Sequence, residues 1–172
     1  KNTMSFESTT GLLDMSDPAK KRAAYELLVQ QTAALLQGER DPIANLAQFS
    51  ALLFQSLPDL NWAGFYLAQG DGLVLGPFQG KVACVRIPFG RGVCGTAAAS
   101  REVQIVPDVH AFPGHIACDS ASNSEVVLPV MHGERLLGVL DLDSPSLARF
   151  DADDATGLAR MLALLVDGTD WA

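Results

Sequence analysis

The hydrophobic period of this chain changes from helical to strand-like and back, and this change limits the fold more than any single motif. Asp17-Pro18 and Asp41-Pro42 each place a capping side chain before a proline at the first helical position. Apolar residues follow both at steps of three and four, which predicts two opening helices. From residue 61 the apolar residues alternate, and Asp151 later begins a closing helix. Helices at both ends and hairpin-linked strands between them predict an α+β fold with an antiparallel sheet. The strands are expected at 61–68, 73–78, 82–87, 103–106, 126–131 and 136–142, with a short helix at 92–99.

Length and composition suit one compact domain. The chain has 172 residues, 48% of them hydrophobic, and a mean hydropathy of +0.18, which favours a globule with its own core over a disordered chain. We expect a single domain over residues 16–168 and an N-terminal extension over residues 1–15. Lys1–Thr3, which precede Met4, are interpreted as a remnant of cloning and set aside.

Charge and hydropathy exclude several kinds of partner. The net charge is −8 and no basic stripe is present, which argues against binding to nucleic acid. The sequence has no run of 18 apolar residues, and its N-terminus lacks the apolar core of a signal peptide, so we expect no contact with a membrane. Three cysteines are an odd number in a chain that needs no disulfide staples. That favours a reducing compartment, and we expect a cytoplasmic location.

The three cysteines differ in their surroundings. Cys84 falls on a predicted strand and Cys94 at the start of the short helix, and both positions suit a buried core thiol. Cys118 lies in the polar, irregular stretch 107–123, where no packing role requires a thiol, so it is the best candidate for a nucleophile. The neighbouring Asp119 would raise its pKa, so a bound substrate or an opposing positive charge must help to activate it.

A zinc site is an alternative for these thiols. Cys84, Cys94, Cys118, His110 and His115 offer enough ligand atoms. However, no two of them are spaced as a short pair such as CxxC or HxxxH, which argues against a structural zinc ion.

Three glycines give a literal GxGxxG pattern after a strand and before a helix, at Gly90, Gly92 and Gly95. A dinucleotide-binding unit would continue into a parallel strand-helix-strand series. Here Pro88 intervenes, the helix is short, and the later strands form a hairpin. The pattern therefore favours a tight turn where the chain leaves the sheet.

Two aromatic residues share one face of the first strand. Trp62 and Tyr66 are four residues apart with Gly64 between them. Ordinary core packing is one interpretation. The other is an aromatic wall with a gap at the glycine that admits a ligand, which suits an ammonium or polarised sulfur group.

Carboxylates gather on the last hairpin. Asp141 and Asp143 are two residues apart on a predicted strand, a setting in which aspartate is depleted. Leu137 and Val139 precede them on the same expected face and suit a buried position, so the face turns from apolar to acidic. Either the acidic end is solvated or it forms the rim of a polar pocket, which Glu125 can join from the partner strand.

The loop of this hairpin sets the register of the acidic cluster. If His132-Gly133-Glu134 is a three-residue loop, counting outward places Glu125 directly opposite Asp141. A two-residue Gly133-Glu134 turn would instead place Glu125 opposite Leu142, on the other face.

Five segments together resemble a known family. They read N-W-A-G-F-Y, G-P-F-Q-G-K-V-A-C, P-F-G-R-G-V-C-G, H-I-A-C-D-S-A-S-N-S-E and G-V-L-D-L-D-S, over residues 61–66, 76–84, 88–95, 115–125 and 138–144. The chain past residue 15 resembles the free methionine-(R)-sulfoxide reductases, which are built on a GAF domain. All three cysteine positions match the family.

The resemblance implies a GAF fold, a six-stranded antiparallel sheet with the N- and C-terminal helices on one face and the ligand pocket on the other. It implies that the protein is an enzyme that reduces free L-methionine-(R)-sulfoxide, and that a homodimer is possible. Cys118 matches the nucleophile, Cys84 the resolving cysteine that forms a disulfide with it, and Cys94 a third cysteine in the relay. Thioredoxin would return the thiols, with no other cofactor and no metal.

The residues fit this chemistry. A neutral carboxylic acid can protonate the sulfoxide oxygen, and attack by Cys118 then leads to a sulfenic acid and a disulfide. The substrate ammonium needs a second negative partner, so Glu125, Asp141 and Asp143 are all candidate site residues, and which one donates the proton stays open. Trp62 and Tyr66 would pack on the methyl group and sulfur. The alternatives are a GAF module that senses a small ligand without turnover, and an interaction domain with inert thiols.

Overall fold

A six-stranded sheet divides the molecule into two sides. The computed structural model describes residues 11–172, so Lys1–Thr3 and most of the expected N-terminal extension lie outside the described residues. Its helices and strands, in chain order, are α1 Pro18–Leu36, α2 Pro42–Ser56, β1 Trp62–Gln69, β2 Gly72–Gly80, β3 Arg86–Pro88, α3 Gly92–Ser100, β4 Gln104–Val106, η1 Val109–Ala111, β5 Ser124–His132, β6 Arg135–Ser144 and α4 Ala152–Asp167. The strand order is β3-β2-β1-β6-β5-β4, and every neighbouring pair is antiparallel.

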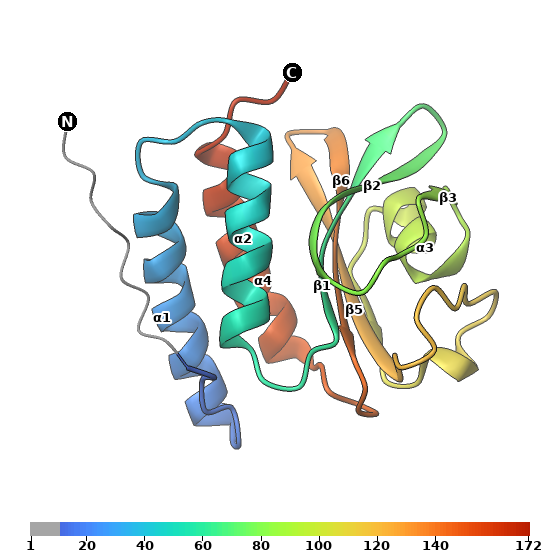
Figure 1. The fold of residues 1–172 in the computed structure, drawn as a ribbon, viewed down its shortest axis with the longest axis horizontal. Helices are drawn as coiled ribbons and strands as arrows, with labels where there is room; N and C mark the ends of the chain where they lie inside the picture. The colour runs from blue at the N-terminus through green and yellow to red at the C-terminus, as the bar shows by residue number, and fades with distance from the viewer. Residues whose placement is uncertain (1–10) are drawn as a thin grey trace.

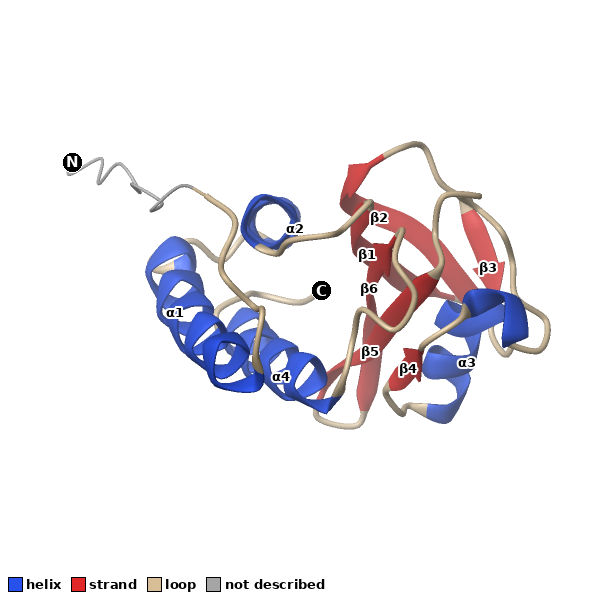
Figure 2. Ribbon diagram, turned by 90° about the horizontal axis from the view of Figure 1, so that it is seen from below, coloured by secondary structure: helices blue, strands red, loops and turns tan. Residues whose placement is uncertain are grey.

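Helices α1, α2 and α4 form one layer, and α3 with the long loops lies on the opposite face of the sheet (Figure 1). Figure 2 shows the same layers from below, with α3 beside β3 and β4. The predicted helix starts are confirmed: Asp17 accepts a hydrogen bond from Lys20 N at 2.8 Å, and Asp41 accepts one from Ala44 N at 2.9 Å. Among residues 11–172, no helix is both long and apolar enough to cross a membrane.

The alternation predicted for β1 is confirmed and gives the sheet two apolar faces. Ala63 and Phe65 belong to the cluster beneath the helices, where Phe65 lies against Phe49 of α2 with ring centroids 5.5 Å apart. Trp62 and Tyr66 belong to a second cluster on the α3 side. A sheet buried on both faces can hold a site on one face while the other anchors it to the helices.

The predicted strand over 82–87 is largely wrong, because only its end is a strand. Strand β2 continues to Gly80, while β3 pairs only with the first three residues of β2. Residues 81–85 therefore form a connection between the two strands, which crosses in front of the sheet in Figure 1. The apolar pattern of this segment does not reflect burial, since Val82 is 88% exposed and Val85 61% exposed. Cys84 thus lies on this connection and not in a strand.

The register predicted for the last hairpin is also wrong, yet the carboxylates still share a face. The turn has two residues, since His132 pairs with Arg135. An irregularity at Val130/Met131 then adds one residue to β6, so that Val130 pairs with Gly138. The two-residue turn shifts the register by one residue, and the β-bulge shifts it by one more. The total shift of two residues keeps the carboxylates on one face, and Glu125 pairs with Asp143 instead of Asp141.

The same bulge moves Leu137 away from the acidic face. It packs in the cluster beneath the helices, whereas Val139 remains on the α3 side below Asp141. The expectation that Leu137 shares a face with the aspartates is therefore wrong, and the expectation for Val139 is confirmed.

Candidate functional site

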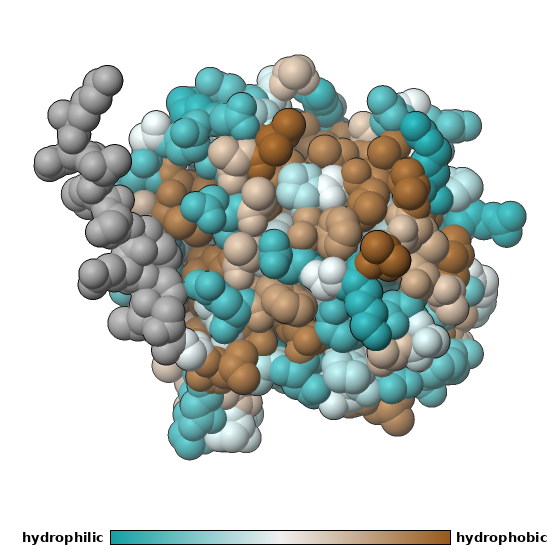
Figure 3. Space-filling view, in the orientation of Figure 1, coloured by the Kyte–Doolittle hydropathy of each residue, from teal (hydrophilic) through white to brown (hydrophobic). Residues whose placement is uncertain are grey.

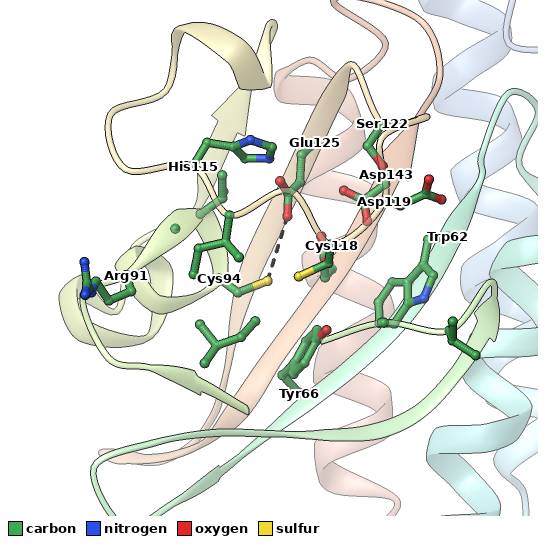
Figure 4. Close-up of a pocket in the computed structure, with 17 residues that line it drawn as sticks. Trp62, Tyr66, Arg91, Cys94, His115, Cys118, Asp119, Ser122, Glu125 and Asp143 are labelled. Atoms are coloured by element: carbon green, nitrogen blue, oxygen red, sulfur yellow. Dashed lines mark hydrogen bonds between the residues drawn. The ribbon is translucent and has the colours of Figure 1, made fainter. Parts of the chain in front are cut away.

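A pocket opens on the sheet face opposite α1, α2 and α4, as the resemblance implies (Figure 4). Its floor is the α3-side face of β1, β5 and β6, and its walls are the first turn of α3, the β2–β3 connection and the loop before β5. The residues that line it are Trp62, Tyr66, Val82, Ala83, Ile87, Arg91, Gly92, Val93, Cys94, His115, Ile116, Cys118, Asp119, Ser122, Glu125, Asp141 and Asp143.

Two of the three cysteines are joined at the wall of this pocket. Cys84 on the β2–β3 connection forms a disulfide with Cys118, and their Cα atoms are 5.5 Å apart. The predicted approach of the long loop to the segment that carries Cys84 is therefore confirmed. Cys118 lines the pocket and Cys84 does not. Both cysteines are partly exposed, so the interpretation of Cys84 as a buried core thiol is wrong.

The third cysteine is buried on the other side of the pocket. Cys94 is a free thiol in the first turn of α3, 5% exposed, and its Sγ donates to Glu125 Oε1 at 3.8 Å. Burial, and then the charges of Asp141 and Glu125, raise the pKa of the Cys94 thiol well above its usual value. Cys94 is therefore a neutral thiol near neutral pH, which makes it a poor nucleophile in this state.

The three carboxylates predicted for the site converge at its floor. Glu125 is 6% exposed and Asp141 5%, and Asp143 is partly buried beside them. Burial raises the pKa of all three, and the charges of their neighbours raise it further, that of Asp141 acting on Glu125 and that of Asp143 acting on Asp141. Asp141 Oδ1 is buried without a hydrogen-bond partner within the described residues. The raised pKa values favour the protonated form of these carboxyl groups, and Asp141 Oδ1 is an acceptor for a cationic group.

The zinc shell considered from the sequence does not form. Cys84 and Cys118 are paired with each other, and His110 Nδ1 lies 2.9 Å from Asp108 Oδ1 on the surface. Within residues 11–172, the metal-ligand atoms that meet are those of Cys94, Glu125 and Asp141, within 4.8 Å of one another. His115 lines the pocket, and burial lowers its pKa.

The aromatic pair forms a wall of the pocket, but the gap at Gly64 is filled. Trp62 and Tyr66 stack with centroids 5.8 Å apart, and Phe78 stacks on Trp62 at 5.1 Å. A Cβ on Gly64 would come within 2.3 Å of Phe78 Cβ, so the expected ligand space beside this glycine does not exist. The Tyr66 hydroxyl donates to the Cys84 carbonyl at 2.9 Å, which ties the β2–β3 connection to the wall.

The three-glycine pattern forms the predicted turn into α3. Gly90 and Gly92 have φ values of +82° and +62°, and a Cβ on Gly95 would come within 2.5 Å of Pro88 O. This turn directs the first turn of α3 into the pocket. Arg91, which no sequence pattern singled out, lies at the end of the lining away from Asp143 (Figure 4).

Sequence reasoning also missed the residue that anchors the Cys118 loop. Asn61, directly before β1, donates from Nδ2 to Asp119 Oδ2 at 3.0 Å and to Ser122 Oγ at 2.9 Å. Both acceptors lie within four residues of Cys118. No sequence signal reveals this contact, because 58 residues separate Asn61 from Asp119. Asn61 thus holds the loop that carries the cysteine against the sheet.

Asn61→Ala is expected to slow formation of the Cys84–Cys118 disulfide about tenfold, since two hydrogen bonds of about 1 kcal/mol each no longer hold the loop. The measurement is the rate at which the reduced protein re-forms the bond in a fixed glutathione buffer. Asn45→Ala is the matched control, because Asn45 donates to Glu39 O and Thr169 Oγ1 on the helix side. Equal rates in the two variants would contradict the anchoring role.

Comparison with known proteins agrees with this geometry. The GAF domain family model matches residues 21–167. The free methionine-R-sulfoxide reductase of Escherichia coli (strain K12) is 56% identical over 145 residues, which cover 84% of this chain and 88% of that protein. The X-ray structure of free methionine-R-sulfoxide reductase from Neisseria meningitidis in complex with its substrate has a TM-score of 0.85 and 44% identity, covering 94% of this chain and 95% of that one. The fRMsr of Staphylococcus aureus in complex with substrate has a TM-score of 0.81 and 47% identity, covering 84% and 94%. At this identity and coverage, the chain belongs to the free methionine-R-sulfoxide reductase family of GAF-domain proteins.

Proposed function

We propose that this protein reduces free methionine-(R)-sulfoxide to methionine with a pair of cysteines. The observation that carries the proposal is the Cys84–Cys118 disulfide at the wall of a pocket whose floor holds three carboxylates of raised pKa. A ligand sensor needs the pocket but not a nucleophile and a resolving thiol within bonding distance. The relatives named above are reductases, and two neighbouring structures hold a substrate.

The pocket suits a zwitterion that carries a polarised sulfur. The substrate ammonium would bind at Asp141 and Asp143, where Asp141 Oδ1 is a buried acceptor without a partner among the described residues. The substrate carboxylate would face the first turn of α3, whose N–H groups have no intrahelical acceptor. Trp62 and Tyr66 would contact the methyl group and sulfur, which places the sulfur toward Cys118.

The chemistry balances with the groups present. A protonated carboxyl group of the cluster donates a hydrogen bond or its proton to the sulfoxide oxygen. The Cys118 thiolate then attacks either the sulfoxide sulfur or the sulfoxide oxygen. The oxygen passes to Cys118 as a sulfenic acid, and methionine leaves with its sulfur reduced by two electrons. The Cys84 thiol then attacks the Cys118 sulfur, which forms the disulfide and releases the oxygen as water. Cys94 stays a neutral thiol and holds the Glu125 carboxyl group in place through its hydrogen bond to Oε1.

The electrons for each cycle come from a second protein. The disulfide is returned to two thiols by thioredoxin, and the protein uses no bound cofactor of its own. This scheme fits a cytoplasmic protein, because that compartment keeps thioredoxin reduced. A homodimer is compatible with the scheme, since every group it uses comes from one chain.

The test is incubation with racemic free methionine sulfoxide, thioredoxin, thioredoxin reductase and NADPH. We expect NADPH consumption and loss of the R epimer alone on a chiral column. Binding of the sulfoxide without turnover, by calorimetry, would support a sensor and reject the proposal.

Recognition of the free ammonium predicts a sharp substrate preference. N-acetyl-methionine-(R)-sulfoxide keeps the sulfoxide but has no positive charge for the buried carboxylates, and an unpaired buried charge is costly. We expect its kcat/KM to be about a hundredfold or more below that of the free amino acid. The methyl ester of methionine-(R)-sulfoxide is the comparison compound: it keeps the ammonium but loses the carboxylate charge that would face α3, and it should lose less activity than the acetylated substrate. Equal turnover of the acetylated and free substrates would contradict binding through the ammonium.

A further inference from the structure

Exposed apolar side chains surround the disulfide. Val82 is 88% exposed, Val85 61% and Ile116 37%, and each lies within two residues of Cys84 or Cys118. Figure 3 shows strongly hydrophobic side chains, with hydrophilic ones beside them, over the part of the surface that the β2–β3 connection crosses. We call Lys81, Val82, Val85, Arg86 and Ile116 the disulfide rim.

The charge of this region is opposite to that of the whole chain. Residues 72–101 include Lys81, Arg86, Arg91 and Arg101 but no aspartate or glutamate, although the net charge of the chain is −8. In the part of the chain that the structure describes, neither Lys81 nor Arg86 forms an ion pair within 4.0 Å. Lys81 and Arg86 therefore make the rim basic and apolar on an acidic protein, and the acidic group beside it is Asp119, whose pKa the charge of Lys81 helps to lower. The rim is complementary to a partner with an acidic, apolar face.

We propose that the disulfide rim is the docking surface for the protein dithiol that reduces the Cys84–Cys118 bond, a partner whose reactive thiol lies in an apolar surface with acidic residues around it. This inference rests on the proposed function, because it supplies the reductant of that cycle. A protein that reduces this disulfide must bring a thiolate into contact with one of its two sulfur atoms. The rim is the surface beside those sulfur atoms, so the partner has to contact it.

The geometry assigns the order of bond changes. Cys84 is partly exposed between the exposed Val82 and Val85 and is not part of the pocket lining, so the partner thiolate attacks its sulfur and forms a mixed disulfide. Cys118 leaves as a thiolate inside the pocket, where the next substrate binds. The second thiol of the partner then displaces Cys84 and closes the partner's own disulfide. The partner loses two electrons, the enzyme gains them, and the two partner protons end on the enzyme thiols.

The test measures this step without any sulfoxide. The oxidised protein is mixed with reduced thioredoxin, and the rate of reduction is followed by alkylation of the released thiols and mass spectrometry. Val85→Asp and the double variant Lys81→Gln/Arg86→Gln remove the apolar and the basic part of the rim. Neither set includes a residue of the pocket lining. We expect each to lower the second-order rate constant about tenfold or more, with the rate for dithiothreitol within twofold of wild type.

Two controls separate docking from other effects. Ile43→Asp places the same charge on an exposed apolar residue of α2, which is 71% exposed and lies on the other side of the sheet, and should leave the thioredoxin rate unchanged. Added salt should slow the reaction of wild type more than that of the double variant.

Several outcomes would overturn the inference. Unchanged thioredoxin rates in both rim variants would do so, and so would an equal loss with dithiothreitol in the conservative double variant. A change in oligomeric state by sedimentation, with thioredoxin rates unchanged, would assign the rim to contact between copies. A wild-type protein that thioredoxin reduces but that turns over no sulfoxide would reject the proposed function and leave the docking surface supported.

Discussion

Cys118→Ser is expected to abolish reduction of free methionine-(R)-sulfoxide even within a single turnover. Cys84→Ser should convert about one equivalent of substrate and then stop, because the sulfenic acid forms on Cys118 but no resolving thiol follows. The measurement is methionine formed per protein in a rapid-quench experiment without reductant. The physical basis is position, since Cys118 lines the pocket and Cys84 is not among the residues that line it.

Cys94→Ser completes the series. It removes the third thiol while a hydroxyl can still donate to Glu125, so one turnover should still produce the Cys84–Cys118 disulfide, as peptide mapping would show. A full equivalent of methionine from Cys118→Ser would refute its role as nucleophile. A disulfide found only between Cys84 and Cys94 after turnover would refute the assignment of the resolving cysteine.

Glu125→Gln and Asp143→Asn are expected to lower kcat/KM about a hundredfold while they stabilise the fold. Activity falls because the cluster loses a proton donor or an ammonium partner. Stability rises because each variant removes one of three buried acidic groups that repel one another. The gain should be about 1 kcal/mol, which corresponds to a rise in Tm of about 2–4 °C at this chain length.

The sign of the pH dependence follows from the raised pKa values. Between the ordinary pKa of Glu125, 4.5, and its higher value in the folded protein, the folded state binds more protons than the unfolded state. The contribution of this group to the free energy of unfolding is therefore full below pH 4.5 and falls as the pH rises through the folded-state pKa. The stability gain of Glu125→Gln should grow from acidic to neutral pH, as thermal unfolding at several pH values would show.

Glu102→Gln is the matched control, because Glu102 is an exposed carboxylate outside the pocket lining. It should leave both activity and the pH profile of Tm unchanged. A Glu125→Gln protein that is less stable than wild type at neutral pH, with normal activity, would show that the cluster is structural.

The sequence predicted the fold well where local physics decides it. The Asp-Pro pairs start α1 and α2 because capping depends on neighbours in the chain. The alternation of Trp62 to Phe65 places each side chain on its observed face, since both faces of β1 are buried. All the candidate site residues except Cys84 line one pocket, and Cys84 is bonded to Cys118 at its wall, although their motifs lie far apart in the sequence.

The errors arose where distant segments decide the structure. Val82–Val85 reads as a strand, but the paired residues of β2 and β3 end at Val74 and Arg86, with one further hydrogen bond from Leu75 N to Val85 O at 2.9 Å. The segment before that bond passes the pocket instead, where Val82 and Ala83 belong to the lining. Gly64 reads as a gap, but Phe78 from the next strand fills it. Asn61 opens the first family-like segment, but nothing in the sequence indicates its role, because that role comes from contacts with residues 58 and 61 positions later.

The β-bulge at Val130/Met131 has a consequence for how this hairpin can change in length. Side chains of a strand alternate between two environments, here a hydrocarbon core and an acidic site, so the face of Asp141 depends on whether the number of residues back to the turn is odd or even. Loss of the single extra residue in β6 would turn Asp141 and Asp143 into the core and expose Leu140 and Leu142 to the pocket. Insertions and deletions in this hairpin should therefore survive selection only in pairs, one in the turn and one in the bulge. The turn can therefore change by one residue only if the bulge changes by one residue as well, because the two together decide which face Asp141 occupies.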